Sequence, residues 1–124
     1  MSIALWVAQV ILALAFLGAG AMKLTKSKEE LAENGMGFVE DFSPGAVRGI
    51  GAVEILGALG LLLPALTGIL PVLTPIAAAG LVITMLVAAA VHIRRGEQSD
   101  VIKNVVLGAI AVFIAWGRFG PYAF

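Results

Sequence analysis

Four long apolar stretches, separated by short polar segments, divide the chain. The first, residues 3–22, carries no charged side chain and is about 20 residues long. At about 1.5 Å per helical residue it can cross a hydrocarbon core of roughly 30 Å. Similar stretches follow at 47–63, 76–93 and 101–117. The pattern predicts an all-α protein, a single integral membrane domain over residues 1–124 in which four transmembrane helices form an up-down bundle.

The longest polar segment, residues 24–46, lies between the first two spans. Ser27 and Glu30 have the spacing of a capping box, which predicts a short helix ending near Asn34. A group of apolar residues then gives the segment an amphipathic character: Met36, Phe38, Val39 and Phe42. Two interpretations stay open. The segment is either a membrane-surface loop whose aromatic rings enter the interface, or a lid or partner-docking loop over the bundle.

Prolines and glycines predict where the later spans begin and end. Pro64 is expected to end the second span, and the uncharged residues 65–74 then form a short link between two antiparallel helices. Thr74 is expected to cap the third span, with Pro75 in its first turn. Gly96, directly after two arginines, should end that span at a water interface.

Helical spacing places small and polar residues on shared faces. We expect three inward faces, one each on spans one, three and four: Gln9, Ala13, Phe16, Gly20 and Lys23; Gly80, Thr84, Ala88 and His92; Asn104, Gly108, Ala111 and Ala115. Other small residues fall off these faces, namely Ala8, Ala15, Ala19, Ala77 and Ala78. Because small residues allow close helix packing in lipid, we expect one such outer face to meet a partner helix.

Composition narrows the classes of function. Hydrophobic residues make up 60% of the chain and charged residues 13%, as expected for a protein surrounded by membrane lipids. The net charge of zero offers no basic surface for nucleic acid. The absence of cysteine excludes thiolate and disulfide chemistry, and one histidine excludes sites that need several. No motif for a catalytic or metal site is present, so we predict neither.

Glu54 is the most informative residue, because it lies near the middle of the second span among glycines and alanines. A carboxylate at that depth costs roughly 2.5–3.5 kcal/mol on insertion scales and usually faces the bundle interior. Counting along each span places Lys23, Glu54, His92 and Asn104 in the same half of the bundle. We predict one buried polar cluster, which serves either as a structural set of interhelical hydrogen bonds or as a ligand or proton site.

Basic residues predict the orientation. Seven of the eight flank the first and third loops, and only Arg118 lies on the other side. The positive-inside rule therefore places loops 1 and 3 in the cytoplasm and both termini outside.

Three segments together resemble the DoxX-like family of small bacterial four-helix membrane proteins. They are Gly20 to Leu24, the run from Glu54 to Pro64 with the pattern E-x-x-G-A-x-G-L-x-L-P, and residues 89–96, AAVHIRRG. The resemblance implies a bacterial inner-membrane location and the same four polar positions. The family is named after a subunit of a quinone-linked thiosulfate oxidoreductase, other relatives are associated with oxidative-stress complexes, and animal relatives are receptor assembly chaperones.

Three functional hypotheses follow. The first is a non-catalytic accessory subunit, without a cofactor, that binds or stabilises other subunits of a larger cell-envelope complex. The second is a membrane subunit of an oxidoreductase that binds a quinone or a lipid. The third is a small proton-coupled transporter in which Glu54 titrates.

Overall fold

The computed structural model describes residues 2–33 and 42–123, which contain five helices and no strand. The four long helices are α1 (Ser2–Thr25), α3 (Pro44–Thr67), α4 (Leu73–Arg95) and α5 (Gln98–Phe119). The short helix α2 (Lys28–Glu33) lies between α1 and α3. Each long helix is apolar and long enough to cross a membrane. The predicted all-α fold with four spans and a short segment between the first two is confirmed.

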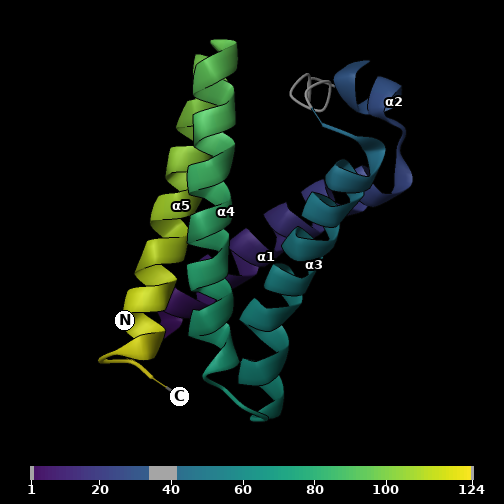
Figure 1. Cartoon of the computed structure of the whole chain (residues 1–124). Helices are drawn as coiled ribbons and strands as arrows, with labels where there is room; N and C mark the ends of the chain where they lie inside the picture. Colours follow the sequence, from purple (N-terminus) through teal and green to yellow (C-terminus); the bar gives the residue numbers. More distant parts are fainter. Residues whose placement is uncertain (1, 34–41, 124) are drawn as a thin grey trace.

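The four long helices are arranged as two pairs (Figure 1). α4 and α5 lie side by side along their length, and α1 packs across α3. The pairs meet at the end that carries both chain termini, which we call the terminus end. They diverge toward the opposite end, where α2 and the turn between α4 and α5 lie; we call this the loop end.

Two serines begin helices, and the spacing of Ser27 and Glu30 predicted the first of them. The Ser27 hydroxyl accepts a hydrogen bond from the Glu30 backbone N–H at 3.2 Å, which confirms Ser27 as the N-cap of α2. The Ser43 hydroxyl accepts one from the Ala46 N–H at 3.1 Å, and Pro44 occupies the first turn of α3. The predicted end of α2 at Asn34 lies outside the described residues, as do Met36, Phe38 and Val39.

Pro64 does not end the second span; the prediction was wrong by one turn. α3 continues to Thr67 and ends at Gly68, whose φ of +72° is a left-handed conformation that glycine adopts without strain. Proline removes only one backbone donor, and close to a helix end this loss does not stop the helix. The chain then reverses within residues 68–72, and α4 begins at Leu73.

Thr74 is not the cap of α4, as the sequence suggested. It lies inside the first turn, because the N–H groups of Leu73 and Thr74 already bond to the carbonyls of Leu70 and Pro71. Its side chain is fully buried, and its hydroxyl has no hydrogen-bond partner in the described part of the chain. The other end of α4 agrees with the prediction, since Gly96 closes it with a φ of +72°.

The apolar core joins all four long helices, and on α4 the predicted inward face is correct only toward the loop end, where Thr84, Ala88 and His92 line the space between the helices. The buried residues of α4 in the core are Ala78, Leu81 and Met85, whereas Gly80 is exposed. Ala78 therefore faces inward and cannot belong to an outer docking face. Ala77 packs at Gly60 of α3, where an added Cβ would lie 2.7 Å from the Ala77 Cβ. On α1 the predicted inward face is correct from Gln9 to Lys23.

α1 and α3 approach most closely where Gly20 meets Gly51. A Cβ built on Gly20 would lie 2.7 Å from the Gly51 carbonyl oxygen, and one on Gly51 would lie 2.8 Å from the Gly20 oxygen. Only glycine fits at either position without moving the helices apart. This approach brings the next turn of each helix, with Lys23 and Glu54, within reach of each other.

α2 packs onto the outer part of the α1–α3 pair. Leu31 is fully buried and forms a small cluster with Val47, against which Met22 and Phe42 pack. Glu29, Glu30 and Glu33 are exposed, so the helix presents acidic side chains outward and Leu31 inward. Burial of one leucine fixes a helix of only six residues to the start of α3.

Candidate functional site: a cavity at the loop end

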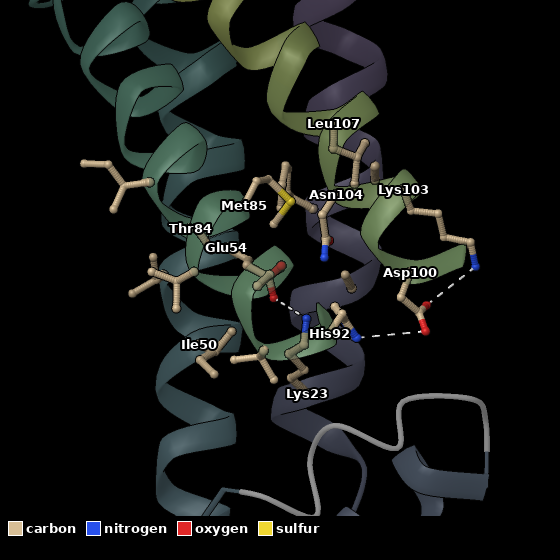
Figure 2. Close-up of a pocket in the computed structure, with 18 of the residues that line it drawn as sticks. Lys23, Ile50, Glu54, Thr84, Met85, His92, Asp100, Lys103, Asn104 and Leu107 are labelled. Atoms are coloured by element: carbon tan, nitrogen blue, oxygen red, sulfur yellow. Dashed lines mark hydrogen bonds and ion pairs between the residues drawn. The ribbon is translucent and has the colours of Figure 1, made fainter. Parts of the chain in front are cut away.

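A cavity of about 660 Å³ lies between the two helix pairs at the loop end. Its walls come from all four long helices and are mainly apolar, with Phe16, Ile50, Val53, Ile83, Val91 and Leu107 among them. Polar groups gather in one region: Lys23, Glu54, Thr84, His92, Asp100, Lys103 and Asn104. Figure 2 shows the ends of Lys23, Glu54, His92 and Asn104 directed toward a common space.

The four residues of the predicted polar cluster thus all line one cavity. Each comes from a different long helix: α1, α3, α4 and α5 in chain order. All four side chains are buried, with residue exposures between 3% and 9%. The sequence placed them in the same half of the bundle because one loop connects α1 to α3 and another connects α4 to α5 at that end. Whether the cluster binds a ligand or is structural stays a prediction.

Glu54 has the inward orientation and the polar partner that the sequence predicted. Lys23 Nζ donates a hydrogen bond to Glu54 Oε1 at 2.5 Å, and both side chains are buried. An opposite charge at this distance stabilises a buried carboxylate that would otherwise be costly. The pair links α1 to α3 beside the Gly20–Gly51 approach, where the Lys23 Cβ would lie 2.9 Å from a Cβ built on Gly51.

Asn104 is the member of the cluster with an unmet hydrogen bond. Its residue is 9% exposed, and its Nδ2 atom is buried without a hydrogen-bond partner in the part of the chain that the structure describes. Figure 2 shows this amide nitrogen pointing into the cavity, toward Glu54 and His92. Buried amides in native proteins are almost always paired.

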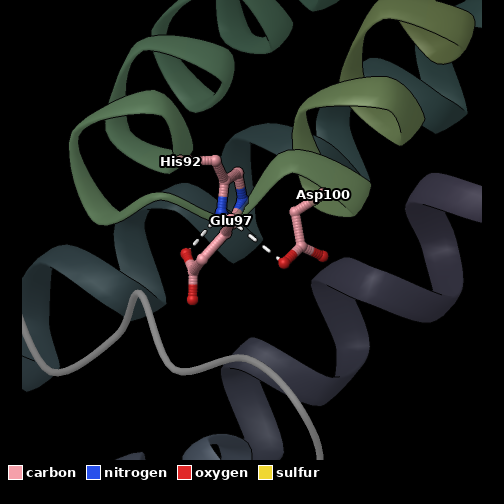
Figure 3. A group of neighbouring side chains, drawn as sticks. All are labelled: His92, Glu97 and Asp100. Carbon is pink, nitrogen blue, oxygen red and sulfur yellow. Dashed lines mark hydrogen bonds and ion pairs between the residues drawn. The ribbon is translucent and has the colours of Figure 1, made fainter.

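His92 forms a second ionic group with two carboxylates of the α4–α5 connection (Figure 3). Its Nδ1 lies 2.8 Å from Glu97 Oε1 and 3.9 Å from Asp100 Oδ2. An ionised carboxylate only accepts, so the shorter contact assigns a proton to Nδ1. The hydrogen bond from His92 lowers the pKa of Glu97, and Arg95 adds to the effect while burial opposes it. His92 is therefore held at the end of α4 and oriented toward the cavity.

The ligand atoms of His92, Glu97 and Asp100 lie within 4.8 Å of one another, a spacing that could hold a metal ion. A single histidine excludes sites that need several, but it does not exclude a site that combines it with two carboxylates from a tight turn. Both carboxylates already have cationic partners, since Arg95 donates to Glu97 at 3.2 Å and Lys103 lies 4.0 Å from Asp100. The grouping is thus charge-compensated by the protein, and we assign it no metal.

Sequence reasoning missed a second polar network, at the terminus end. Gln9 is fully buried; its Nε2 donates to the Leu61 carbonyl at 2.7 Å, and its Oε1 accepts from Arg118 Nε at 2.8 Å. Arg118 also donates to the Tyr122 carbonyl at 2.9 Å and lies over the Trp6 ring. The available signal was the position of Arg118 one helical turn from an aromatic C-terminal segment, opposite a glutamine on α1.

A family model for the DoxX-like family matches residues 7–114. The chain belongs to the DoxX-like family. This match includes α3, α4 and most of α1 and α5, and it contains all four residues of the polar cluster. Together with four apolar helices it identifies a small multi-pass membrane protein. Comparisons with curated proteins and with solved structures gave no match. DoxX-like membership therefore gives the class of protein.

Proposed function

We propose that this DoxX-like protein is a non-catalytic membrane subunit that binds a quinone or a lipid in the cavity at its loop end. In this proposal it contributes that ligand site to a larger complex of the cell envelope. The observation that carries the proposal is a cavity of about 660 Å³ with apolar walls and a compact polar region. Sites for small molecules have this character and typically measure roughly 300–1,000 Å³.

The shape of the opening supports a ligand that arrives from the bilayer. Val53 on α3 and Ile83 and Val87 on α4 line the cavity, and each is more than half exposed. In a membrane these apolar side chains face lipid tails, so the rim between α3 and α4 adjoins the hydrocarbon region. A lipid-soluble molecule can then place its tail along this rim and its head among the polar groups.

Two other hypotheses have less support from the geometry. A transporter that depends on Glu54 needs a carboxylate that exchanges protons, but Glu54 is held by Lys23 at 2.5 Å. A purely structural subunit needs no cavity, because interiors normally leave few voids larger than a water molecule. The accessory role and ligand binding are compatible, and we propose them together.

The proposed location is the bacterial inner membrane, with the loop end in the cytoplasm. Figure 1 places both termini at one end of the bundle and α2 with the α4–α5 turn at the other. The flanking basic residues favour this orientation. A cysteine at Ser2 should react with an impermeant thiol reagent on intact cells, whereas one at Ser99 should not. The opposite labelling would reverse the topology.

Native mass spectrometry of the mildly extracted protein tests the ligand. We expect a small apolar molecule to stay bound to the wild type and to be identified after solvent extraction. Ala88→Phe should remove it, because Ala88 lines the cavity. Ala90→Phe is the matched control, since Ala90 lies on the same helix and is exposed. If the wild type carries no ligand and binds neither quinones nor lipids, the ligand-binding proposal fails.

A further inference from the structure

The cavity contains a buried donor for which the described part of the chain offers no acceptor. Asn104 Nδ2 is excluded from solvent and has no hydrogen-bond partner among the described residues. In Figure 2 it points into the same space as the carboxylate of Glu54 and the ring of His92. A buried N–H without an acceptor is unfavourable, so a site built this way favours a molecule that brings an acceptor with it.

The ionic groups around this donor are matched in charge. Lys23 is paired with Glu54, Arg95 contacts Glu97, and Lys103 lies near Asp100. A phosphate or carboxylate head would need a cation that is not already opposed by a carboxylate. The balance of charge at the cavity favours a neutral head.

We infer that the ligand is a neutral amphiphile whose head carries a carbonyl oxygen, and that this oxygen accepts a hydrogen bond from Asn104 Nδ2. The inference rests on the proposed function and specifies which chemistry the cavity selects. A quinone ring and the ester of a neutral glyceride both offer such a carbonyl. Val53, Ile83 and Val87 provide the apolar surface for the tail.

Binding of four probes to the full-length protein in nanodiscs tests this assignment. Decylubiquinone and dioctanoylglycerol are neutral and carry carbonyls. Decylbenzene has a comparable tail without an acceptor, and dioctanoylphosphatidylglycerol has an anionic head. We expect at least one of the first two to bind the wild type most tightly; which of them does so identifies the source of the carbonyl.

Asn104→Leu should weaken binding of the carbonyl probe about tenfold, which is the effect of losing one buried hydrogen bond. The affinity for decylbenzene should change by less than about twofold, since its binding depends on apolar contact alone. Asn104→Asp, which keeps the shape but presents acceptors when ionised, should lose the carbonyl probe at least as strongly. Isotope-edited infrared spectra of the wild type give a readout without a variant: the bound carbonyl stretch should move to lower frequency.

The possible failures are distinguishable. If decylbenzene and the carbonyl probes lose affinity equally in Asn104→Leu, the cavity binds apolar molecules but Asn104 does not select them. Equal binding of the carbonyl probe to Asn104→Asp, or an unshifted carbonyl stretch, also overturns the inference. Preferential binding of the anionic probe would overturn the inference that the ligand has a neutral head. If no probe binds the wild type, the proposed function fails as well.

Discussion

The two ends of the bundle differ in how their buried polar groups are paired. At the terminus end, Gln9 and Arg118 join α1, α3 and α5 by hydrogen bonds, and Leu5 packs so tightly at Gly117 that an added Cβ would lie 2.6 Å from it. At the loop end, the Lys23–Glu54 pair borders a cavity, and a buried amide nitrogen of Asn104 has no described partner.

This difference shows that a polar residue within a membrane span is not by itself a functional site. Gln9 is more deeply buried than Asn104, but both ends of its amide form hydrogen bonds. The Thr74 hydroxyl at the terminus end also has no hydrogen-bond partner among the described residues, but it does not line the cavity. What distinguishes the loop end is that its unmet donor, Asn104 Nδ2, borders a cavity of about 660 Å³. The following variants test whether the two ends really differ in this way.

The largest effect is expected from Lys23→Met. It leaves the Glu54 carboxylate buried without its cation, which should destabilise the protein by roughly 3–5 kcal/mol. Reversible unfolding in mixed micelles measures the change. The double variant Lys23→Met with Glu54→Leu should recover most of the loss, because both charges are then absent. A double variant as unstable as the single one would show that the pair is not the source of the effect.

Gly20→Ala should cause the next largest loss of stability. Its Cβ would lie 2.7 Å from the Gly51 carbonyl oxygen, and overpacking of this kind typically costs about 1–3 kcal/mol. Gly18→Ala is the control on the same helix, since its Cβ meets nothing within 4 Å. We expect that control to be neutral or stabilising by up to about 1 kcal/mol. Equal effects on unfolding would contradict a close α1–α3 approach at the loop end.

Gln9→Leu tests whether a polar residue that stabilises the fold can be distinguished from one that binds the ligand. It removes the acceptor for Arg118 Nε and the donor to the Leu61 carbonyl, so stability should fall by about 1–3 kcal/mol. Affinity for the cavity ligand should not change, because the substitution lies at the terminus end. Asn104→Leu should instead lower the affinity for the cavity ligand and leave the stability nearly unchanged. If Gln9→Leu lowers affinity as strongly as Asn104→Leu, the two ends are not independent.

The smallest expected effect is on the loss of stability at low pH. The pKa of Glu97 is lowered by its hydrogen bond from His92, so its stabilisation is complete above the unfolded-state pKa near 4.5 and is lost as the pH falls through the folded value. Between pH 7 and pH 3, the free energy of unfolding of the wild type should fall by up to about 1 kcal/mol more than that of Glu97→Gln. Glu33→Gln, at an exposed position on α2, is the control and should retain the wild-type acid response.

Much of the architecture could be predicted from the sequence. Apolar stretches of sufficient length determined the four spans, and the cap at Ser27 followed from its spacing to Glu30. The common depth of Lys23, Glu54, His92 and Asn104 followed from counting residues between span ends. These inferences succeed because they depend on local chemistry and on the thickness of the bilayer.

Only the tertiary structure decided which faces of the helices meet. Ala78 was expected to face outward and Gly80 inward, and the reverse is true. In a soluble protein the boundary between apolar and polar residues marks the buried face, but in lipid both the core and the outer surface are apolar. The sequence of α4 therefore leaves its rotation undetermined, and packing against α3 and α5 decides it.

The same physical reason explains the candidate site. That Glu54 needs a partner follows from its burial, but the choice of Lys23 depends on the approach of two helix backbones at Gly20 and Gly51. The cavity, and an Asn104 Nδ2 without a partner among the described residues, depend on how far the two helix pairs diverge, which no local pattern encodes. The sequence by itself determined which residues are polar and how deep they lie; helix rotation and crossing determined which of them meet and which face a cavity.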